Sequence, residues 1–384
     1  MSSVRLDVKI PFNRPTVAGS ELEYIRQAIE NGHLAGDGPF TERCQEWLVS
    51  KLGCRAALLT HSCTAALELA ALLLDIEPGD EVIMPSFTFV STANAVVLRR
   101  GVPVFVDIRP DTLNINEQLI ERAITPRTRA IFPVHYAGVP AEMDTIIALA
   151  AKYKLAVVED AAQALGSTYR GRPAGSLGDL AALSFHETKN LISGEGGALA
   201  INRDTFIERA EIIREKGTNR KRFFRGQIDK YTWVDFGSSF LPGELVASFL
   251  FGQLEKSADI NSDRMQTWLA YDEALRPFHN FGVQTPKVPQ DCSHNAHLYY
   301  IILPKPAQRA DLIQRMKADG VMTPFHYVPL HSAPAGKQFG RVSGDVKQTE
   351  KLSECLVRLP LFPKIGLERD QVIDRLQQHL REIL

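Results

Sequence analysis

Short apolar runs alternate with longer amphipathic segments through the first 200 residues. The runs are bounded by glycine, proline or polar residues, which is typical of buried strands, and they cover 55–60, 81–85, 102–107, 130–134, 155–159, 181–185 and 197–201. Segments with apolar positions three and four apart predict helices over 20–31, 41–52, 64–74, 88–99 and 142–153. This alternation predicts an α/β fold with a largely parallel sheet that helices cover on both faces.

Past residue 205 the pattern becomes mainly helical. Helices are predicted over 205–215, 244–257, 258–275, 308–319 and 369–384, and strand-like runs over 297–303 and 321–327. We expect residues 1–257 to form a large domain that includes the N-terminal helices. Residues 258–384 are then a linking helix and a small C-terminal α+β domain.

Composition narrows the class of protein. The chain has 384 residues, of which 45% are hydrophobic, and its 44 Lys and Arg balance 45 Asp and Glu. This balance favours neither nucleic acid nor an anionic membrane as a partner. The N-terminus predicts no export signal, and the five cysteines contain no CxxC pair. We therefore expect a cytoplasmic protein with reduced thiols.

The predicted strand 181–185 ends in a polar turn that carries one lysine. Ligands of open α/β sheets bind beyond the carboxyl ends of the strands. Ser184 is therefore a candidate to hold a phosphate, and Lys189 to form a Schiff base with a carbonyl cofactor. Taken alone, the turn fits an ordinary solvated lysine at least as well.

Two carboxylates, Glu159 and Asp160, stand at the exit of the predicted strand 155–159, and Gln163 follows them. A buried Asp160 could keep a pyridinium ring protonated, so that the ring acts as an electron sink. It could equally cap the next turn. Gln163 could be an ordinary polar loop residue.

The step from the predicted strand 55–60 into the following helix places Ser62, Cys63 and Thr64 at a helix N-terminus. Free amides there, with the Thr64 hydroxyl, make an anion site that suits a phosphate. Simple capping by Ser62 uses the same geometry. Catalysis by Cys63 is disfavoured because no base is identifiable beside it.

Aromatic and histidine side chains mark two further segments. Phe87 and Phe89 stand at another strand-to-helix junction, where either ring could stack on a flat cofactor or belong to the core. In the C-terminal part, His326, Tyr327 and His331 either lie in a solvated loop or face a substrate. The spacing of the two histidines, with prolines between them, is poor for a metal site, and no metal is predicted.

A basic run from Arg214 to Arg225 is typical of a solvated face, although it could also attract a pyrophosphate. No GxGxxG motif follows the first strand, and the glycines around Glu195 have the wrong spacing for one. A nicotinamide cofactor therefore loses its main sequence support.

Three segments together resemble the sugar-nucleotide aminotransferases of the DegT/DnrJ/EryC1/StrS family, namely 62–67, 159–163 and 184–190. The likeness covers nearly the whole chain. Within the family it is greatest to the transaminases that make dTDP-4-amino-4,6-dideoxygalactose for enterobacterial common antigen, through 80–92, 134–138, 184–190, 214–220 and 325–331.

The resemblance implies a fold-type-I enzyme that uses pyridoxal 5'-phosphate (PLP) and works as a homodimer with active sites at the subunit interface. Lys189 would bind the cofactor and carry the proton, and Asp160 would pair with the ring nitrogen. The implied cofactor contacts are Cys63, Thr64, Phe89, Asp160, Gln163, Ser184 and Lys189. The implied substrate contacts are His186, Glu195, His326, Tyr327 and His331.

One segment departs from the family pattern. Many members carry Asn-Tyr-Arg where residues 237–242 of this chain read Gly-Ser-Ser-Phe-Leu-Pro. In the family, that segment reaches the neighbouring subunit's phosphate. Ser239 is the candidate to replace it here as a donor.

The implied reaction moves the amino group of L-glutamate to C4 of dTDP-4-keto-6-deoxy-D-glucose (EC 2.6.1.59), giving the galacto product and 2-oxoglutarate. A transaminase acting at C3 or on a UDP-linked sugar stays open. Lys189 counts against the related sugar dehydratases, which replace this lysine with histidine. The presence of both Lys189 and Asp160 counts against a non-catalytic homologue.

Overall fold

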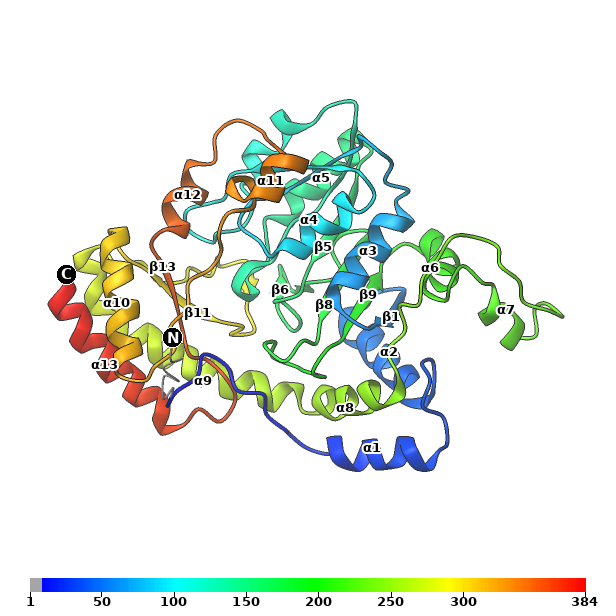
Figure 1. Cartoon of the computed structure of the whole chain (residues 1–384), viewed down its shortest axis with the longest axis horizontal. Helices are drawn as coiled ribbons and strands as arrows, with labels where there is room; N and C mark the ends of the chain where they lie inside the picture. The colour runs from blue at the N-terminus through cyan, green and yellow to red at the C-terminus, as the bar shows by residue number, and fades with distance from the viewer. Residues whose placement is uncertain (1–8) are drawn as a thin grey trace, which may run out of the picture.

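A computed structural model describes residues 9–384 and is organised around an eight-stranded sheet (Figure 1). In spatial order its strands are β1 (Ala56–Thr60), β9 (Gly197–Ile201), β8 (Leu180–Ser184), β5 (Ala156–Asp160), β4 (Thr128–Ile131), β2 (Glu81–Pro85), β3 (Val102–Val106) and β12 (Arg341–Val342). Neighbours from β8 to β12 are parallel, whereas β9 runs antiparallel to both β1 and β8. The prediction of a largely parallel α/β sheet is confirmed.

Helices cover both faces of this sheet because successive strand residues point in opposite directions. Leu58 belongs to the core on one face and Leu59 to the core on the other. The first core includes α3 (Cys63–Leu73), α4 (Val90–Val97) and α6 (Ile207–Arg214). The opposite face packs against α2 (Pro39–Leu52), α8 (Glu244–Glu255) and α5 (Met143–Tyr153), and α1 (Glu21–Glu30) lies against α8.

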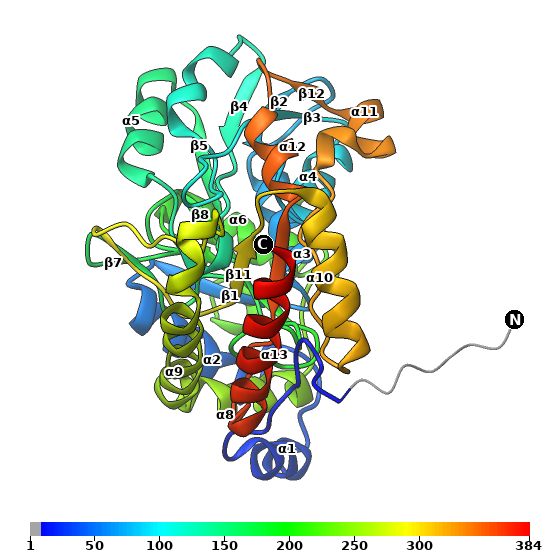
Figure 2. The same ribbon diagram turned by 90° about the vertical axis from the view of Figure 1, so that its left-hand side faces the viewer.

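The C-terminal part builds a smaller unit around an antiparallel pair, β11 (Tyr299–Ile302) and β13 (Leu356–Leu359). Figure 2 shows three helices beside this pair: α9 (Ser257–Leu275), α10 (Pro306–Ala318) and α13 (Leu367–Ile383). Buried Tyr271, Leu312 and Leu376 from these helices share one apolar core with β11 and β13. The expected fold-type-I architecture, a large sheet with a small C-terminal domain, is confirmed.

The remaining strands and α-helices are short. They are β6 (Thr168–Tyr169), β7 (Arg172–Pro173), β10 (Cys292–Ser293), α7 (Arg220–Phe224), α11 (Pro334–Phe339) and α12 (Lys347–Ser353). Helix α7 projects from the body at the far right of Figure 1. Between residues 9 and 384, no helix combines the length and the apolar character needed to cross a bilayer.

The strand expected over 321–327 is wrong. Val321 makes only an isolated bridge with Ile10, and the segment that follows has no regular structure. Pro324 lacks the amide hydrogen that a continuous strand ladder needs. The true partner of β11 is β13, and the Arg358 amide of that strand donates to the Pro324 carbonyl at 2.9 Å.

Candidate active site

A cavity of about 590 Å³ opens at the carboxyl ends of β5 and β8, beside the first turn of α3. This is the edge at which open α/β sheets bind their ligands. All but two of the predicted site residues line it: Cys63, Thr64, Phe89, Asp160, Gln163, Ser184, His186, Lys189, Glu195, His326 and Tyr327.

Asp160 is the last residue of β5 and is 5% exposed. Its Oδ2 accepts a hydrogen bond of 2.7 Å from the Thr92 hydroxyl, and its Oδ1 accepts one of 3.2 Å from the Ala162 amide. The Thr88 and Thr92 hydroxyls lie 2.9 Å apart. Because Thr92 gives its own proton to the carboxylate, Thr88 must be the donor in that second bond. This chain of donors holds a buried carboxylate in one orientation.

Lys189 lies in the loop between β8 and β9, with its backbone amide bonded to the His186 carbonyl at 2.8 Å. Burial lowers the pKa of its amine, and Arg358 adds to this effect, while Cys63 and Asp160 oppose it. A lowered pKa increases the neutral, nucleophilic fraction of a lysine at a given pH. The amine is therefore suited to attack a carbonyl.

A cradle of backbone amides and hydroxyl groups lies where α3 begins. Ser62 caps the helix by accepting a 3.0 Å hydrogen bond from the Ala65 amide, which leaves the amides of Cys63 and Thr64 in the first turn. The Thr64 hydroxyl bonds to Ser91 at 2.7 Å. Burial raises the pKa of the Cys63 thiol well above its ordinary value, so this thiol is protonated rather than nucleophilic.

Gly197 allows this cradle to form. In β9 it pairs with Thr60 on one side and with Ser184 on the other. A Cβ at Gly197 would lie 2.4 Å from the Cys63 nitrogen and 2.3 Å from the Ser62 carbonyl carbon, so no side chain fits there. The bare backbone of β9 thus lets the amides of α3 approach the end of β8, and the donor set fits a phosphate.

Burial distinguishes the two candidate aromatic residues, Phe87 and Phe89. Phe87 is fully buried, with its ring centroid 5.1 Å from that of Tyr136 and 5.5 Å from that of Tyr327. Phe89 lines the cavity and is 59% exposed. Of the two, Phe89 is therefore the ring that a flat cofactor could contact. Across the cavity, Gln163 is fixed by accepting from the Ala137 amide at 2.7 Å.

The C-terminal part closes the cavity with an aromatic pair. His326 stacks on Tyr327 with centroids 3.5 Å apart, and its Nδ1 lies 3.1 Å from the Tyr136 hydroxyl. Gln163 Nε2 donates to the Tyr327 hydroxyl at 3.1 Å. Burial lowers the pKa of His326 and raises that of Tyr327, so both side chains are neutral at pH 7.

Glu159, unlike its neighbour Asp160, does not line the cavity. It is fully buried and accepts hydrogen bonds from the amides of Gly175, Leu177 and Gly178 at 2.7–2.8 Å, and His135 Nε2 lies 2.8 Å from its Oε2. It therefore fixes the loop before β8 to β5. This contact keeps the two strands that carry Asp160 and Ser184 together.

Two predicted site residues lie outside the cavity lining. Ser239 is exposed and makes an isolated backbone bridge with Glu215. His331 is bonded to Ser86, with its Nδ1 2.7 Å from the hydroxyl. The basic run 214–225 also stays away from the cavity. Arg214 is buried and pairs with Asp37 at 2.7 Å.

Sequence reasoning missed two arginines that line the cavity. Arg358 is on β13, stacks over the Phe12 ring at 4.2 Å, and has a buried Nε without a hydrogen-bond partner among the described residues. Arg264 on α9 donates to the carbonyls of Ala296 and His297, while its Nη1 has no partner in the same part of the chain. For Arg358, the sequence did offer a signal, because this arginine is the single charged residue within the apolar run 355–362.

The chain is similar over nearly its whole length to several known proteins. The chain is 36% identical to the uncharacterised protein MJ1066 of Methanocaldococcus jannaschii over 95% of both chains. It is 32% identical to the spore coat polysaccharide biosynthesis protein SpsC of Bacillus subtilis, covering 98% of this chain and 97% of SpsC. Spr1654 of Streptococcus pneumoniae, described as a sugar aminotransferase and solved in its PMP form, superposes with a TM-score of 0.91 at 26% identity, covering 98% of this chain and 100% of Spr1654.

A family model for the DegT/DnrJ/EryC1/StrS aminotransferases matches residues 15–377. This match spans both the large sheet and the C-terminal unit, including every cavity-lining residue beyond Asn13. The chain belongs to the DegT/DnrJ/EryC1/StrS aminotransferase family.

Proposed function

We propose that this protein is a PLP-dependent aminotransferase that converts a keto sugar nucleotide into an amino sugar nucleotide. The observation that carries the proposal is a single cavity that holds the Lys189 amine with its lowered pKa, the fixed carboxylate of Asp160 and the amides at the start of α3. PLP is supported as the cofactor because Spr1654 has been solved in both PLP and PMP forms.

Different residues around the cavity would bind different parts of the cofactor. Ser184, Thr64 and the amide of Cys63 would bind its phosphate, and Phe89 and Gln163 would contact its ring. Asp160 would keep the ring nitrogen protonated. When bound, PLP supplies the electron sink for proton transfer at a carbon next to nitrogen. Lys189 would take up and return that proton.

The two arginines missed by the sequence suggest how an acidic amino donor is bound. Arg264 and Arg358 line the cavity, and each has one buried nitrogen without a hydrogen-bond partner within residues 9–384. Guanidinium groups pair with carboxylates through parallel hydrogen bonds. We infer that these arginines receive the carboxylates of L-glutamate.

For the acceptor we propose dTDP-4-keto-6-deoxy-D-glucose, with dTDP-4-amino-4,6-dideoxy-D-galactose and 2-oxoglutarate as products. The support is the resemblance at 80–92, 184–190, 214–220 and 325–331, whose final segment places His326 and Tyr327 at the cavity. His186 and Glu195, whose side chains lie 3.6 Å apart, would contact the sugar at the cavity rim. This acceptor would place the enzyme in the synthesis of enterobacterial common antigen.

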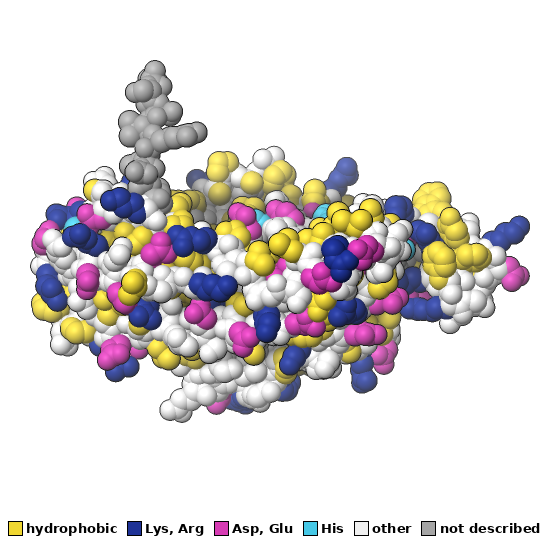
Figure 3. Space-filling model, turned by 90° about the horizontal axis from the view of Figure 1, so that it is seen from below, with side chains coloured by type: hydrophobic (Ala, Val, Ile, Leu, Met, Phe, Trp, Pro, Cys, Tyr) yellow, Lys and Arg dark blue, Asp and Glu magenta, His cyan; other side chains and the backbone are white. Residues whose placement is uncertain are grey.

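We also propose a homodimer that shares its active sites. Helix α7 and the segment after it project from the body, and Figure 3 shows hydrophobic side chains gathered on this projection. Phe224 and Trp233 there are 68% and 77% exposed. Exposed aromatic groups of this kind mark interaction surfaces. Ser239 at the base of the projection would then reach the partner's phosphate cradle.

The experiment that tests the function is incubation with glutamate and a panel of dTDP- and UDP-linked keto sugars, followed by mass and NMR analysis of the product. The proposal predicts a C4 amine of galacto configuration from the dTDP substrate, and no product from Lys189→Ala. An amine at C3, or a preference for a UDP-linked sugar, would show that the acceptor differs from the one proposed here. Dehydration without amine transfer would contradict the function itself.

A further inference from the structure

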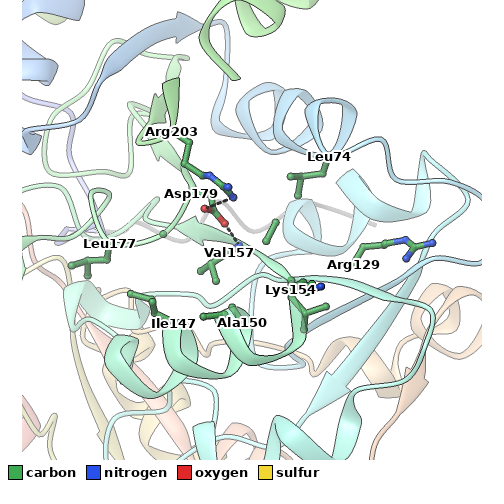
Figure 4. A pocket seen from close by; sticks show the side chains of 13 residues that line it. Leu74, Arg129, Ile147, Ala150, Lys154, Val157, Leu177, Asp179 and Arg203 are labelled. Atoms are coloured by element: carbon green, nitrogen blue, oxygen red, sulfur yellow. Dashed lines mark hydrogen bonds and ion pairs between the residues drawn. The ribbon is translucent and has the colours of Figure 1, made fainter. Parts of the chain in front are cut away.

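A second cleft, of about 600 Å³, lies at the edge of the sheet opposite the active site (Figure 4). Four neighbouring strands bring their residues to it. Arg129 lies in β4, Leu155 precedes β5, Asp179 precedes β8, and Arg203 follows β9. Since β4, β5 and β8 are parallel and β9 is antiparallel to β8, these four positions share one edge of the sheet.

The cleft has an apolar floor and a cationic rim. Its floor is aliphatic and is formed by Leu74, Ile147, Ala150, Val157 and Leu177. Figure 4 shows Arg203 on one side of this floor, with Lys154 and Arg129 on the other. Asp179 is the one acidic residue of the lining, against three cationic residues. The lining therefore carries an excess of positive charge beside an uncharged surface.

These cations differ in how they are paired. Asp179 accepts a 2.8 Å hydrogen bond from the Val157 amide and pairs with Arg203 at 3.1 Å. Arg129 pairs with Asp80, which lies outside the lining, at 2.9 Å. Lys154 has no ion-pair partner within 4.0 Å among the residues that the structure describes. A ligand could thus meet the Lys154 ammonium without breaking an ion pair.

The backbone at Lys154 is also unusual. It ends α5 in the left-handed conformation, with φ of 56°. Glycine or asparagine occupies such helix ends at lower cost. A glycine can therefore replace Lys154 without disturbing the end of α5.

We propose that this cleft is a second ligand site for a small amphipathic anion. The anionic head, a phosphate monoester, lies against Lys154, and its apolar body covers the aliphatic floor. The volume is in the range of small-molecule sites. The proposal depends on the cleft alone and is independent of the reaction in the other cavity.

Calorimetric titration of the PLP-loaded protein with hexyl phosphate, inorganic phosphate and hexanol tests this site. We expect hexyl phosphate to bind at least about tenfold more tightly than either inorganic phosphate or hexanol, because both the head and several methylene groups are bound. Saturating dTDP, which would occupy the active site, should leave this binding unchanged. Equal affinities for hexyl phosphate and inorganic phosphate, or displacement by dTDP, would overturn the proposal.

Two variants of the same helix sharpen the test. Lys154→Gly removes the ammonium and suits the left-handed backbone, so the fold is retained. It should weaken hexyl phosphate binding at least about fivefold. Lys152→Gln removes the same charge two positions away, outside the cleft lining, and should leave binding unchanged. Equal losses in both variants would indicate general charge attraction and contradict the site. No step uses glutamate or a sugar nucleotide, so failure here is distinct from failure of the proposed function.

Discussion

The Thr92 hydroxyl donates a 2.7 Å hydrogen bond to Oδ2 of Asp160, and both groups are buried. A hydrogen bond to a charged group contributes about 1.5–3 kcal/mol. Thr92→Val keeps the shape of the side chain and removes this donor. We therefore expect the variant to lose about tenfold or more in kcat, measured with glutamate as donor.

Thr88→Val is the matched control for this prediction. It removes the hydroxyl next to Thr92 but leaves the bond to Asp160 in place. Its kcat should fall less than that of Thr92→Val. If the two variants are equally impaired, Thr92 does not act through the carboxylate.

The absence of a side chain at Gly197 predicts a selective effect on phosphate binding. In Gly197→Ala, the new methyl group would meet the backbone of Ser62 and Cys63 and move the first turn of α3. We expect the affinity of the apoenzyme for PLP to fall at least about tenfold, because the displaced amides would be charge-assisted donors to the phosphate in the proposed cradle. Equilibrium titration followed by absorbance measures this affinity.

Pyridoxal, which lacks the phosphate, provides the control for Gly197→Ala. Its affinity should change much less than that of PLP. A proportional loss for both ligands would show that the substitution damages the whole cavity rather than the cradle.

The lowered pKa of Lys189 predicts how its reactivity depends on pH. Burial disfavours the ammonium form, so the neutral amine should appear as the pH rises through a value below that of an ordinary lysine. Limited reductive methylation of the apoenzyme, followed by peptide mass spectrometry, should therefore label Lys189 at lower pH than Lys347. Hydrogen bonding to Asp345 raises the pKa of Lys347 and makes it an internal reference.

Asp160→Asn predicts the direction in which the labelling midpoint of Lys189 should move. Because Asp160 raises the pKa of Lys189, its neutralisation should move the labelling midpoint to still lower pH. A shift to higher pH, or a midpoint above that of Lys347 in the parent protein, would refute the electrostatic account of this lysine.

A buried carboxylate on β2 predicts the acid sensitivity of the fold. Burial alone would raise the pKa of Glu81, but hydrogen bonds from Arg341, Thr125 and Arg127 bring it to about 2. A folded pKa below the unfolded value of 4.5 stabilises the protein above pH 4.5. This contribution, about 3 kcal/mol, is lost as the pH falls from 4.5 towards 2.

Urea unfolding of Glu81→Gln at pH 7 should accordingly show a loss of about 3 kcal/mol, as β12 loses its anchor on the sheet. The dependence of stability on pH below 4.5 should also become flatter. Glu121→Gln is the control, because its ion pair with Lys152 is exposed and should matter little. An unchanged free energy of unfolding in Glu81→Gln would contradict this assignment.

The proposed catalytic pair could be predicted from sequence because each residue stands at or just after the carboxyl end of an apolar strand. Asp160 ends β5 and Lys189 follows β8, and parallel neighbours present their carboxyl ends at the same edge. The cradle at α3 was likewise visible as a strand-to-helix step with a capping serine. These signals are local to the chain and need no knowledge of how distant segments pack.

Contributions from distant segments could not be predicted in the same way. Arg264 and Arg358 reach the cavity only because the C-terminal unit packs against the carboxyl edge of the large sheet. The prediction of a strand at 321–327 was wrong because it relied on the apolar pattern and gave too little weight to Pro324, which prevents strand pairing there. No local sequence pattern indicates that Gly197 lies against the Cys63 backbone, since this contact joins residues far apart in the chain.

All of the proposed chemistry depends on Lys189 being the amine that binds PLP. Borohydride reduction of the PLP-loaded protein, followed by peptide mass spectrometry, measures this directly. We predict one phosphopyridoxyl group, on the peptide that contains Lys189, and none in Lys189→Ala. A label on another lysine, or no label while PLP remains bound, would contradict it.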